Sequence, residues 1–429
     1  MRVQLFAATA LFALASPAQA EWWEAKTDHF IVYSESSAAN AKEFAEKMER
    51  LDMSLRSLQN VKFSPATSDS RKLTVFRFGE IDDMGRLAGS SGVAGFYIPN
   101  LGGSVSFTPA KSDSRSTGEL LGSRGRSSKT NLDPQQVLFH EYTHHFMFQH
   151  FTAAYPSWYV EGFAETAATI DLRPDGSFHL GNPPQYRSDA LFNSMLNVSA
   201  ERLLASTNKP TGEDQYGWYT IGWLLNHYLT FEPSRKGQLK QYLRAINDGV
   251  KPADAARQAF GDLDKLNRQI TSYKSGKLPG VDVRIANFTP PTVEMRKLTP
   301  DEEAIMKVRM RSKRGVDRKL APDVAHDARS VAEKYPNSFA VQLALAEAEL
   351  DLSDFEPQSL ARAEAAADRA LALKPDSVEA MIYKGRAILE RRKSDKSKLA
   401  EARSCFAKAF DEDPDHAAPL FYNYLTYFE

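Results

Sequence analysis

The chain has 429 residues, 42% of them apolar, and carries 54 lysines and arginines against 55 aspartates and glutamates. This is an ordinary globular composition with room for two or three domains, which excludes a disordered chain, a collagen and a small disulfide scaffold. A formal net charge of −1 gives no overall field that would attract nucleic acid, so no nucleic-acid partner is expected. The single cysteine, Cys405, cannot close an intrachain disulfide or build a thiolate metal site.

Residues 1–20 have the three parts of a secretory signal peptide. Arg2 gives a basic start, an apolar stretch follows from position 5 to position 15, and Ala18-Gln19-Ala20 is a small-x-small ending. The alternative is a membrane anchor, but the stretch is shorter than the roughly 18 apolar residues that a spanning helix needs. We therefore predict cleavage after Ala20 and a secreted mature protein without a transmembrane segment, with the bacterial periplasm as its compartment.

The mature chain opens with a pattern typical of a strand followed by a helix. Residues 29–33 alternate as a half-buried strand does, and residues 36–58 repeat apolar side chains at helical spacing. Residues 72–78 alternate again and predict a second strand. The opening of the chain thus predicts a mixed α and β domain.

Two further runs, 93–98 and 104–108, flank a turn sequence and predict a β-hairpin. Residues 110–131 are rich in serine, glycine, arginine and lysine, which predicts a loop and leaves open whether it acts as a lid. Helical patterns dominate from Asp133 onward.

Prolines at a fixed interval mark a repeat in the last third of the chain. Pro336, Pro375 and Pro414 are 39 residues apart, and small residues recur at matching positions in the helical segments between them. The pattern resembles the tetratricopeptide repeat, lengthened by about five residues over the usual 34. The resemblance implies an all-α array of helical hairpins over residues 301–429 that binds a protein partner; an unrelated hairpin array would share the same small-residue spacing.

A proline-rich stretch separates the two patterns. Residues 279–300 contain four prolines and predict an extended connector after a domain formed by residues 21–278. Residues 322–429 carry a formal charge of −6, whereas residues 21–321 carry about +4, so the two halves of the mature chain differ in sign.

Seven basic residues lie close together between Lys307 and Lys319. Such a run on a helix is typical of a solvated face, and a contact with phosphate or lipid is the alternative. We predict the solvated face.

The sequence His140-Glu141-Tyr142-Thr143-His144 follows a helix start, because Asp133 can cap the first turn and Pro134 suits its first position. Residues four apart share one helix face, so both imidazoles can reach one ion while Glu141 approaches a ligand beside it. This arrangement favours Zn²⁺, which takes nitrogen and oxygen donors and activates a water. Two packed or exposed histidines on a helix are the alternative, and a third ligand decides between them.

A second helical segment supplies a candidate for that third ligand. Pro156 and Ser157 predict a helix start, and Glu161 comes 17 positions after His144. If the second helix runs antiparallel to the first, the Glu161 carboxylate lies beside the imidazoles. Glu165, one turn further on, can then accept a hydrogen bond from the far nitrogen of a bound histidine.

Together these two segments resemble the gluzincin metallopeptidases of the peptidase MA-like superfamily. In that family the H-E-x-x-H helix is followed by a helix with the third ligand, often in an N-E-G-F-A-type string, and residues 160–164 match this string except that valine replaces asparagine. The resemblance implies an α+β zincin-like catalytic domain with a small mixed sheet. It also implies zinc as cofactor, a peptide or protein substrate, and these roles: metal ligands His140, His144 and Glu161, general base Glu141, and outer acid Glu165.

Aminopeptidases of this family carry a glycine-rich Met-Glu-Asn segment before the zinc helix. No such segment occurs between Gly92 and Asp133, so aminopeptidase activity is not expected. By the same resemblance, the strand at 104–108 forms the sheet edge that pairs with an extended peptide.

A peptidase also needs a donor for the developing oxyanion. Tyr216 and Tyr219 are candidates, as is His227, although clustered aromatic residues are often core packing. His145 points about 100° away from His144 around the helix, so we expect no metal ligand there.

The sequence thus predicts a secreted zinc peptidase. Two alternatives stay open: an inactive peptidase-like protein that works through its helical repeats, and a metal-dependent hydrolase of a non-peptide bond.

Overall fold

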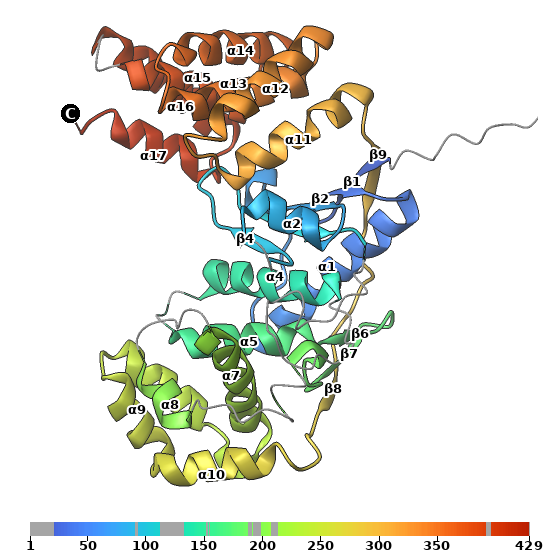
Figure 1. Ribbon diagram of the computed structural model, residues 1–429, viewed down its shortest axis with the longest axis vertical. Helices are drawn as coiled ribbons and strands as arrows, with labels where there is room; N and C mark the ends of the chain where they lie inside the picture. Colours follow the sequence, from blue (N-terminus) through green and yellow to red (C-terminus); the bar gives the residue numbers. More distant parts are fainter. Residues whose placement is uncertain are drawn as a thin grey trace, which may run out of the picture.

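The structure is a computed structural model that describes residues 21–90, 93–111, 133–151, 153, 155–187, 191, 199–206, 213–391 and 396–428. The signal peptide predicted at residues 1–20 lies outside the described residues, as does most of the loop predicted at 110–131. An N-terminal part with a mixed sheet and helices is followed by an all-helical C-terminal part (Figure 1). No helix in the described ranges combines the length and apolar character that crossing a bilayer requires.

The main sheet of the described residues has the order β4-β5-β3-β2-β1-β9. β2 and β3 are parallel, as are β3 and β5, and the other neighbouring pairs are antiparallel. The strands near 29–33 and 72–78 and the hairpin are therefore confirmed. The strands of this sheet are β1 (Trp22–Lys26), β2 (Phe30–Glu35), β3 (Leu73–Phe78), β4 (Phe96–Ile98), β5 (Val105–Pro109) and β9 (Glu294–Lys297).

The prediction that residues 104–108 form the sheet edge is wrong. β5 pairs with β3 on one side and with β4 on the other, so among the described strands β4 occupies that edge. The reason is that β5 enters the sheet in parallel beside β3, which leaves its hairpin partner outside.

The proline-rich segment 279–300 is extended, as predicted, but it also contributes strands to the N-terminal part. β8 (Val281–Arg284) completes a small sheet with β6 (Asp171–Leu172) and β7 (Ser177–Leu180), and β9 pairs with β1 of the main sheet. Both ends of the connector are therefore held by backbone hydrogen bonds.

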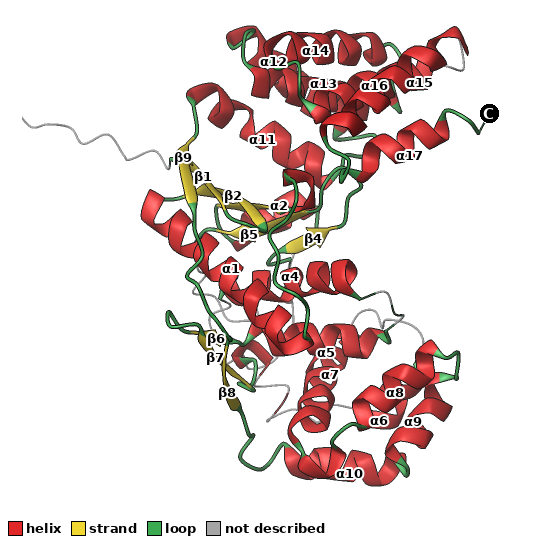
Figure 2. Ribbon diagram, turned by 180° about the vertical axis from the view of Figure 1, so that it is seen from behind, coloured by secondary structure: helices red, strands yellow, loops and turns green. Residues whose placement is uncertain are grey.

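Each face of the main sheet packs on a different part of the chain, because side chains alternate along a strand. Phe30 and Val75 lie in one core with the helices α1 (Ala38–Gln59) and α4 (Pro134–His150), whereas Phe76 and Phe107 lie in another core with Met306 of α11 (Pro300–Arg314). Figure 2 shows α1 and α4 on one side of the sheet and α11 on the other. The helices of the N-terminal part are α1 (Ala38–Gln59), α2 (Ile81–Ala88), α4 (Pro134–His150), α5 (Ser157–Ala168), α6 (Ala200–Ala205), α7 (Glu213–Phe231), α8 (Gln238–Asn247), α9 (Pro252–Phe260) and α10 (Leu263–Tyr273), with the short turns η1 (Asp69–Arg71), η2 (Gln185–Arg187) and η4 (Pro233–Arg235).

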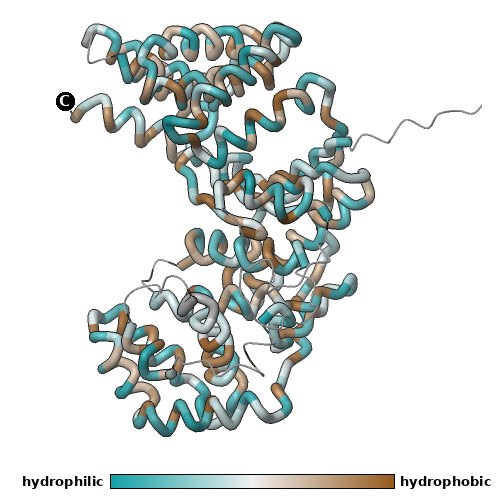
Figure 3. Tube along the Cα trace, in the orientation of Figure 1, coloured by the Kyte–Doolittle hydropathy of each residue, from teal (hydrophilic) through white to brown (hydrophobic). Residues whose placement is uncertain are grey.

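The C-terminal part is a stack of antiparallel helical hairpins, referred to below as the helical array. The repeated prolines Pro336, Pro375 and Pro414 each lie between two helices, and hydrophilic and hydrophobic residues alternate along the helices (Figure 3). Small residues permit close packing: a Cβ on Gly385 would meet the Phe406 ring at 2.5 Å. The helices are α11 (Pro300–Arg314), α12 (Ala321–Lys334), α13 (Phe339–Ser353), α14 (Ser359–Leu373), α15 (Val378–Glu390), α16 (Leu399–Glu412) and α17 (Ala417–Leu425), with the short turn η6 (Lys396–Lys398).

The prediction that the basic run 307–319 is a solvated face is wrong for Arg309 and Lys313 of α11, whereas Lys307, Arg318 and Lys319 are exposed. The Lys313 ammonium lies 2.7 Å from the Glu347 carboxylate and donates to the Tyr383 hydroxyl at 3.0 Å. Arg309 stacks over the Tyr33 ring at 4.6 Å. α11 thus contacts β2 of the N-terminal part through Arg309 and the following helices of the array through Arg311 and Lys313, whose charges are opposite to those of Asp327 and Glu347.

Candidate metal centre

Three donor atoms from α4 and α5 converge on one point. The two Nε2 atoms of His140 and His144 are 3.1 Å apart, and Glu161 Oε2 lies 3.2 Å from the first and 3.4 Å from the second. Donors bound tetrahedrally at 2.0–2.1 Å stand about 3.3 Å from one another, since that is the edge of such a tetrahedron. The triangle therefore has the size that a zinc ion requires, and one side remains for a further ligand.

α4 presents the two imidazoles because its start and its rear face are fixed. The Asp133 carboxylate accepts from the Gln135 backbone N–H at 2.9 Å, which caps the first turn, and Pro134 begins the helix as predicted. On the opposite face, the Tyr142 hydroxyl donates to buried Asp52 of α1 at 2.6 Å. The helix is thereby held against α1 in both position and rotation.

α5 brings Glu161 to the imidazoles through an unusually close crossing with α7. A Cβ on Gly162 would lie 2.4 Å from the backbone oxygen of Gly222, and one on Gly222 would lie 2.9 Å from the oxygen of Trp158. Only glycine allows the two backbones to approach so closely. Asn226 of α7 adds a hydrogen bond to the Thr166 hydroxyl at 2.9 Å.

The electrostatics of the triangle favour a charged carboxylate. Burial opposes ionisation of Glu161, but hydrogen bonds from His140 and His144 hold its pKa far below the usual range. Burial alone would lower the pKa of His140, yet Glu161, Glu165 and Glu141 together raise it. Negative charge around the histidines is also what a divalent cation needs.

Glu165 is fully buried one turn beyond Glu161, and its Oε1 lies 3.8 Å from His140 Nδ1, the nitrogen that faces away from the triangle. Tyr186 donates to Glu165 Oε2 at 2.5 Å, and Arg187 donates to Oε1 at 2.7 and 3.2 Å. The structure therefore places the predicted outer acid beside the histidine and surrounds it with two further side chains.

Tyr186 and Arg187 were not among the residues predicted from the sequence. They lie in the short turn η2, more than 20 residues after Glu165, and no local pattern distinguishes them. The one available signal was indirect: a glutamate buried beside a metal site needs a cation or hydrogen-bond donors to stay ionised.

The remaining candidates lie around the triangle to different degrees. Glu141 is half-buried, and its charge raises the pKa of His140, which indicates that the two are close. The Tyr219 ring lies 6.0 Å from the His140 ring, and the Arg187 guanidinium lies 5.0 Å from the Tyr219 ring. Tyr216 belongs to α7, but its side chain is outside the described residues.

His227 does not belong to the site. Its Nδ1 pairs with the Tyr273 hydroxyl at 2.9 Å and its Nε2 with the Gly181 carbonyl at 3.0 Å, so both ring nitrogens are engaged in the core. The prediction that His227 could donate a hydrogen bond to the oxyanion is therefore wrong. His145 bonds the Tyr97 hydroxyl at 3.0 Å and lies outside the triangle, as expected.

A second buried group contains His29, Glu49 and Asp52. His29 Nδ1 lies 2.5 Å from a Glu49 oxygen and its Nε2 lies 2.9 Å from the Ser64 carbonyl, while Asp52 is held by Arg56 at 2.5 Å. Since both nitrogens and the carboxylates already have partners, this group is a structural charge network. It anchors α1 under the sheet.

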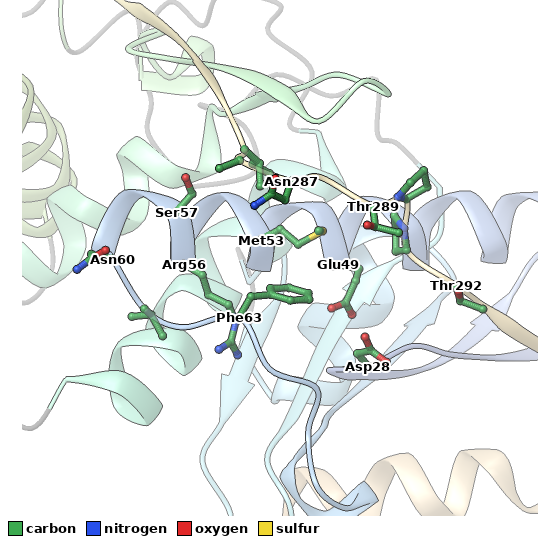
Figure 4. A pocket seen from close by; sticks show the side chains of 15 residues that line it. Asp28, Glu49, Met53, Arg56, Ser57, Asn60, Phe63, Asn287, Thr289 and Thr292 are labelled. Atoms are coloured by element: carbon green, nitrogen blue, oxygen red, sulfur yellow. The ribbon is translucent and has the colours of Figure 1, made fainter.

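That network borders a cavity of about 650 Å³ between α1 and residues 285–292 (Figure 4). Of its charged lining residues, Glu49 and Arg56 are already paired with His29 and Asp52, and Asp28 is exposed at its margin. The lining of the cavity therefore brings no set of unpaired functional groups together. The candidate site is the group of His140, His144 and Glu161, called the metal triangle below.

The sequence matches no protein-family model and no curated protein. Function is therefore inferred from the site and from the resemblance of its motifs.

Proposed function

We propose that the protein is a zinc-dependent peptidase of the gluzincin type. The observation that supports this most directly is the triangle of His140, His144 and Glu161, whose edges of 3.1–3.4 Å match a tetrahedral zinc site. When bound there, zinc would polarise a carbonyl and lower the pKa of a water to about 7.

In this proposal Glu141 takes the proton from the attacking water and delivers it to the leaving amine, because it follows the first ligand on the same helix. Glu165, held by Tyr186 and Arg187, orients the His140 ring and keeps its Nδ1 proton in place. Tyr219 is the proposed donor to the developing oxyanion. Tyr216 remains a second candidate for that role.

The substrate would be an extended segment of peptide or protein. β4 is the edge strand nearest to α4 among the described strands, and its open backbone groups suit a peptide that adds one more strand. This replaces residues 104–108 as the proposed docking edge. We propose that the activity is not that of an aminopeptidase, because no amine-binding segment precedes α4.

The rest of the proposal concerns location and partners. We propose that the chain is exported to the periplasm through residues 1–20 and that the helical array, as a tetratricopeptide-like domain, binds a protein partner or presents a substrate.

The decisive experiment compares the purified mature protein with the Glu141→Gln variant. We expect the variant to keep its zinc, measured by elemental analysis, and to cleave a peptide library about 10²–10⁴-fold more slowly. Glu43→Gln, an exposed glutamate of α1, is the matched control and should leave both quantities unchanged.

Native turnover by Glu141→Gln would refute the proposed base. Zinc binding by the wild-type chain without any cleavage of the library would favour the inactive platform or the hydrolase of a non-peptide bond. A chelator should abolish cleavage, and added zinc should restore it.

A further inference from the structure

The last helix, α17, has apolar residues on all sides, yet only one side is covered. Residues 417–428 contain no charged side chain, and Ala418 and Pro419 are buried against the array. A helix that is apolar all round belongs in an interior. Its uncovered side is formed by large side chains that are about half exposed or more: Leu420 (53%), Phe421 (45%), Tyr424 (56%), Tyr427 (64%) and Phe428 (60%).

These five residues are called the aromatic face below; three of them lie on α17, and Tyr427 and Phe428 follow in the turn after Leu425. The spacing of Leu420, Phe421 and Tyr424 places them within about 100° of arc on the helix. The Phe428 ring lies 4.1 Å from the Tyr424 ring, so the turn continues the same face. The final turn is held in place, because Arg403 donates to the Thr426 hydroxyl at 2.8 Å and to its carbonyl at 2.9 Å. The aromatic face is therefore held in a fixed position against α16.

The repeat shows what such a face normally meets. The residues 39 positions before Leu420, Phe421 and Tyr424 are Met381, Ile382 and Gly385, which are buried in α15, and Gly385 packs on Phe406 of the next helix, α16. Within the described part of the chain no helix covers α17 in the same way. The aromatic face thus has the position that another helix occupies elsewhere in the array.

We propose that the aromatic face is covered by α17 of a second copy of this chain, in a two-fold symmetric dimer. The five side chains themselves carry no charge although residues 322–429 carry −6, and the Arg403 guanidinium lies 4.0 Å from the Tyr427 ring, so two copies can meet there without carboxylates in contact. In a two-fold symmetric dimer the aromatic face of each copy packs on the aromatic face of the other, so both faces are covered. Figure 1 shows α17 at the margin of the molecule, where a second copy has access.

The size of the face agrees with a dimer of modest affinity. Large apolar side chains that are half exposed each contribute on the order of 100 Å², so five of them on each copy bury roughly 1,000 Å² in total. This lies near the lower limit for a specific interface. We therefore expect a dimer that dissociates in the micromolar range.

Sedimentation equilibrium of the full mature chain tests the proposal, with and without chelator, because the dimer does not depend on the metal site. Tyr424→Glu should raise the dimer dissociation constant at least tenfold, since it places two carboxylates opposite each other. Leu373→Glu, an equally exposed apolar residue on α14, is the matched control and should leave it unchanged. Circular dichroism checks that both variants are folded.

A wild-type chain that stays monomeric at concentrations well above micromolar would overturn the proposal, and so would a dimer that Tyr424→Glu does not weaken. Oxidation of Tyr424→Cys in a Cys405→Ser background should cross-link two copies, whereas Leu373→Cys should not. Failure of both Phe421→Cys and Tyr424→Cys chains to cross-link would also contradict it.

Discussion

The metal triangle and the helical array differ in how their buried charged side chains are arranged. In the triangle, His140, His144 and Glu161 face one shared point. In the array, a buried carboxylate such as Glu349 lies between Arg329 at 2.5 Å and Arg362 at 2.9 Å. The comparison indicates that convergence on a point, and not burial of charge as such, distinguishes the candidate site.

The two regions also differ in how they are held together. The array is built largely from helices that follow one another in the chain, so its contacts are local. The triangle depends on distant elements: α1 holds the rear of α4, and α7 holds α5 through Gly162 and Gly222. A long-range site is therefore the more sensitive of the two to small backbone shifts.

The largest expected effect comes from replacing one buried glutamate in each region. Glu161→Gln should weaken zinc binding by more than about a thousandfold, beyond the roughly 10–100-fold that loss of an outer partner costs. Glu349→Gln should leave zinc binding unchanged and lower the free energy of unfolding by about 1 kcal/mol, because its arginine partners are partly exposed. Zinc competition titration and urea unfolding measure the two quantities. If both variants weaken zinc binding equally, the proposed difference between the two regions is refuted.

The paired charges between α11 and the array provide the next test. Lys313→Met removes the cation from Glu347 and from the neighbourhood of Asp351, whose pKa burial and Glu347 already raise to about 7. We expect a loss of about 2 kcal/mol in unfolding free energy, since the pair is partly buried and its loss leaves Glu347 without its cation. Lys307→Met, exposed on the same helix, should change little. An unaffected Lys313→Met protein would mean that this contact does not hold α11 to α13 and α15.

A smaller effect is expected from the outer partners of the triangle. Glu165→Gln should weaken zinc binding by roughly 10–100-fold, because the His140 ring loses the charge that orients it. Tyr186→Phe removes one of the hydrogen bonds to Glu165 and should act in the same direction with a smaller change. If Tyr186→Phe weakens zinc binding more than Glu165→Gln does, the proposal that Tyr186 acts on the site through Glu165 is incorrect.

The effect that is smallest at neutral pH concerns His227, which is buried and neutral. Burial lowers its pKa from 6.5 to about 4, so below pH 6.5 the unfolded chain takes up a proton that the folded chain does not. Its contribution to stability is therefore present above pH 6.5 and is lost as the pH falls towards 4, at about 1 kcal/mol per pH unit. Unfolding free energies measured across this range should fall less steeply for His227→Gln; identical slopes would contradict the neutral assignment.

Much of the candidate site follows from local sequence. The cap at Asp133, the proline at 134 and the four-residue spacing of the histidines depend on neighbouring residues alone, and the structure has α4 beginning where they predict. The same kind of local signal, a helix start at Pro156 and Ser157, predicts the position of Glu161. The strands and the hairpin near 93–108 were found by alternation, which is also a local property.

The errors share a cause, which is that neighbours in space are not neighbours in sequence. The basic run of α11 resembles a solvated face until Glu347 and Tyr383, 34 and 70 residues from Lys313, pack against it. The hairpin order was correct, but the pairing of β5 with β3 decided which strand lies at the edge.

The amino-acid sequence by itself determined where α4 and α5 begin, which residues repeat, and which side chains could bind a metal, because capping, periodicity and spacing act over a few residues. Only the tertiary structure decided that the three donor atoms meet within 3.1–3.4 Å, that Tyr186 and Arg187 surround Glu165, and that one side of α17 stays uncovered. The physical reason is that these features are set by the packing of segments far apart in the chain, and no local propensity encodes that packing.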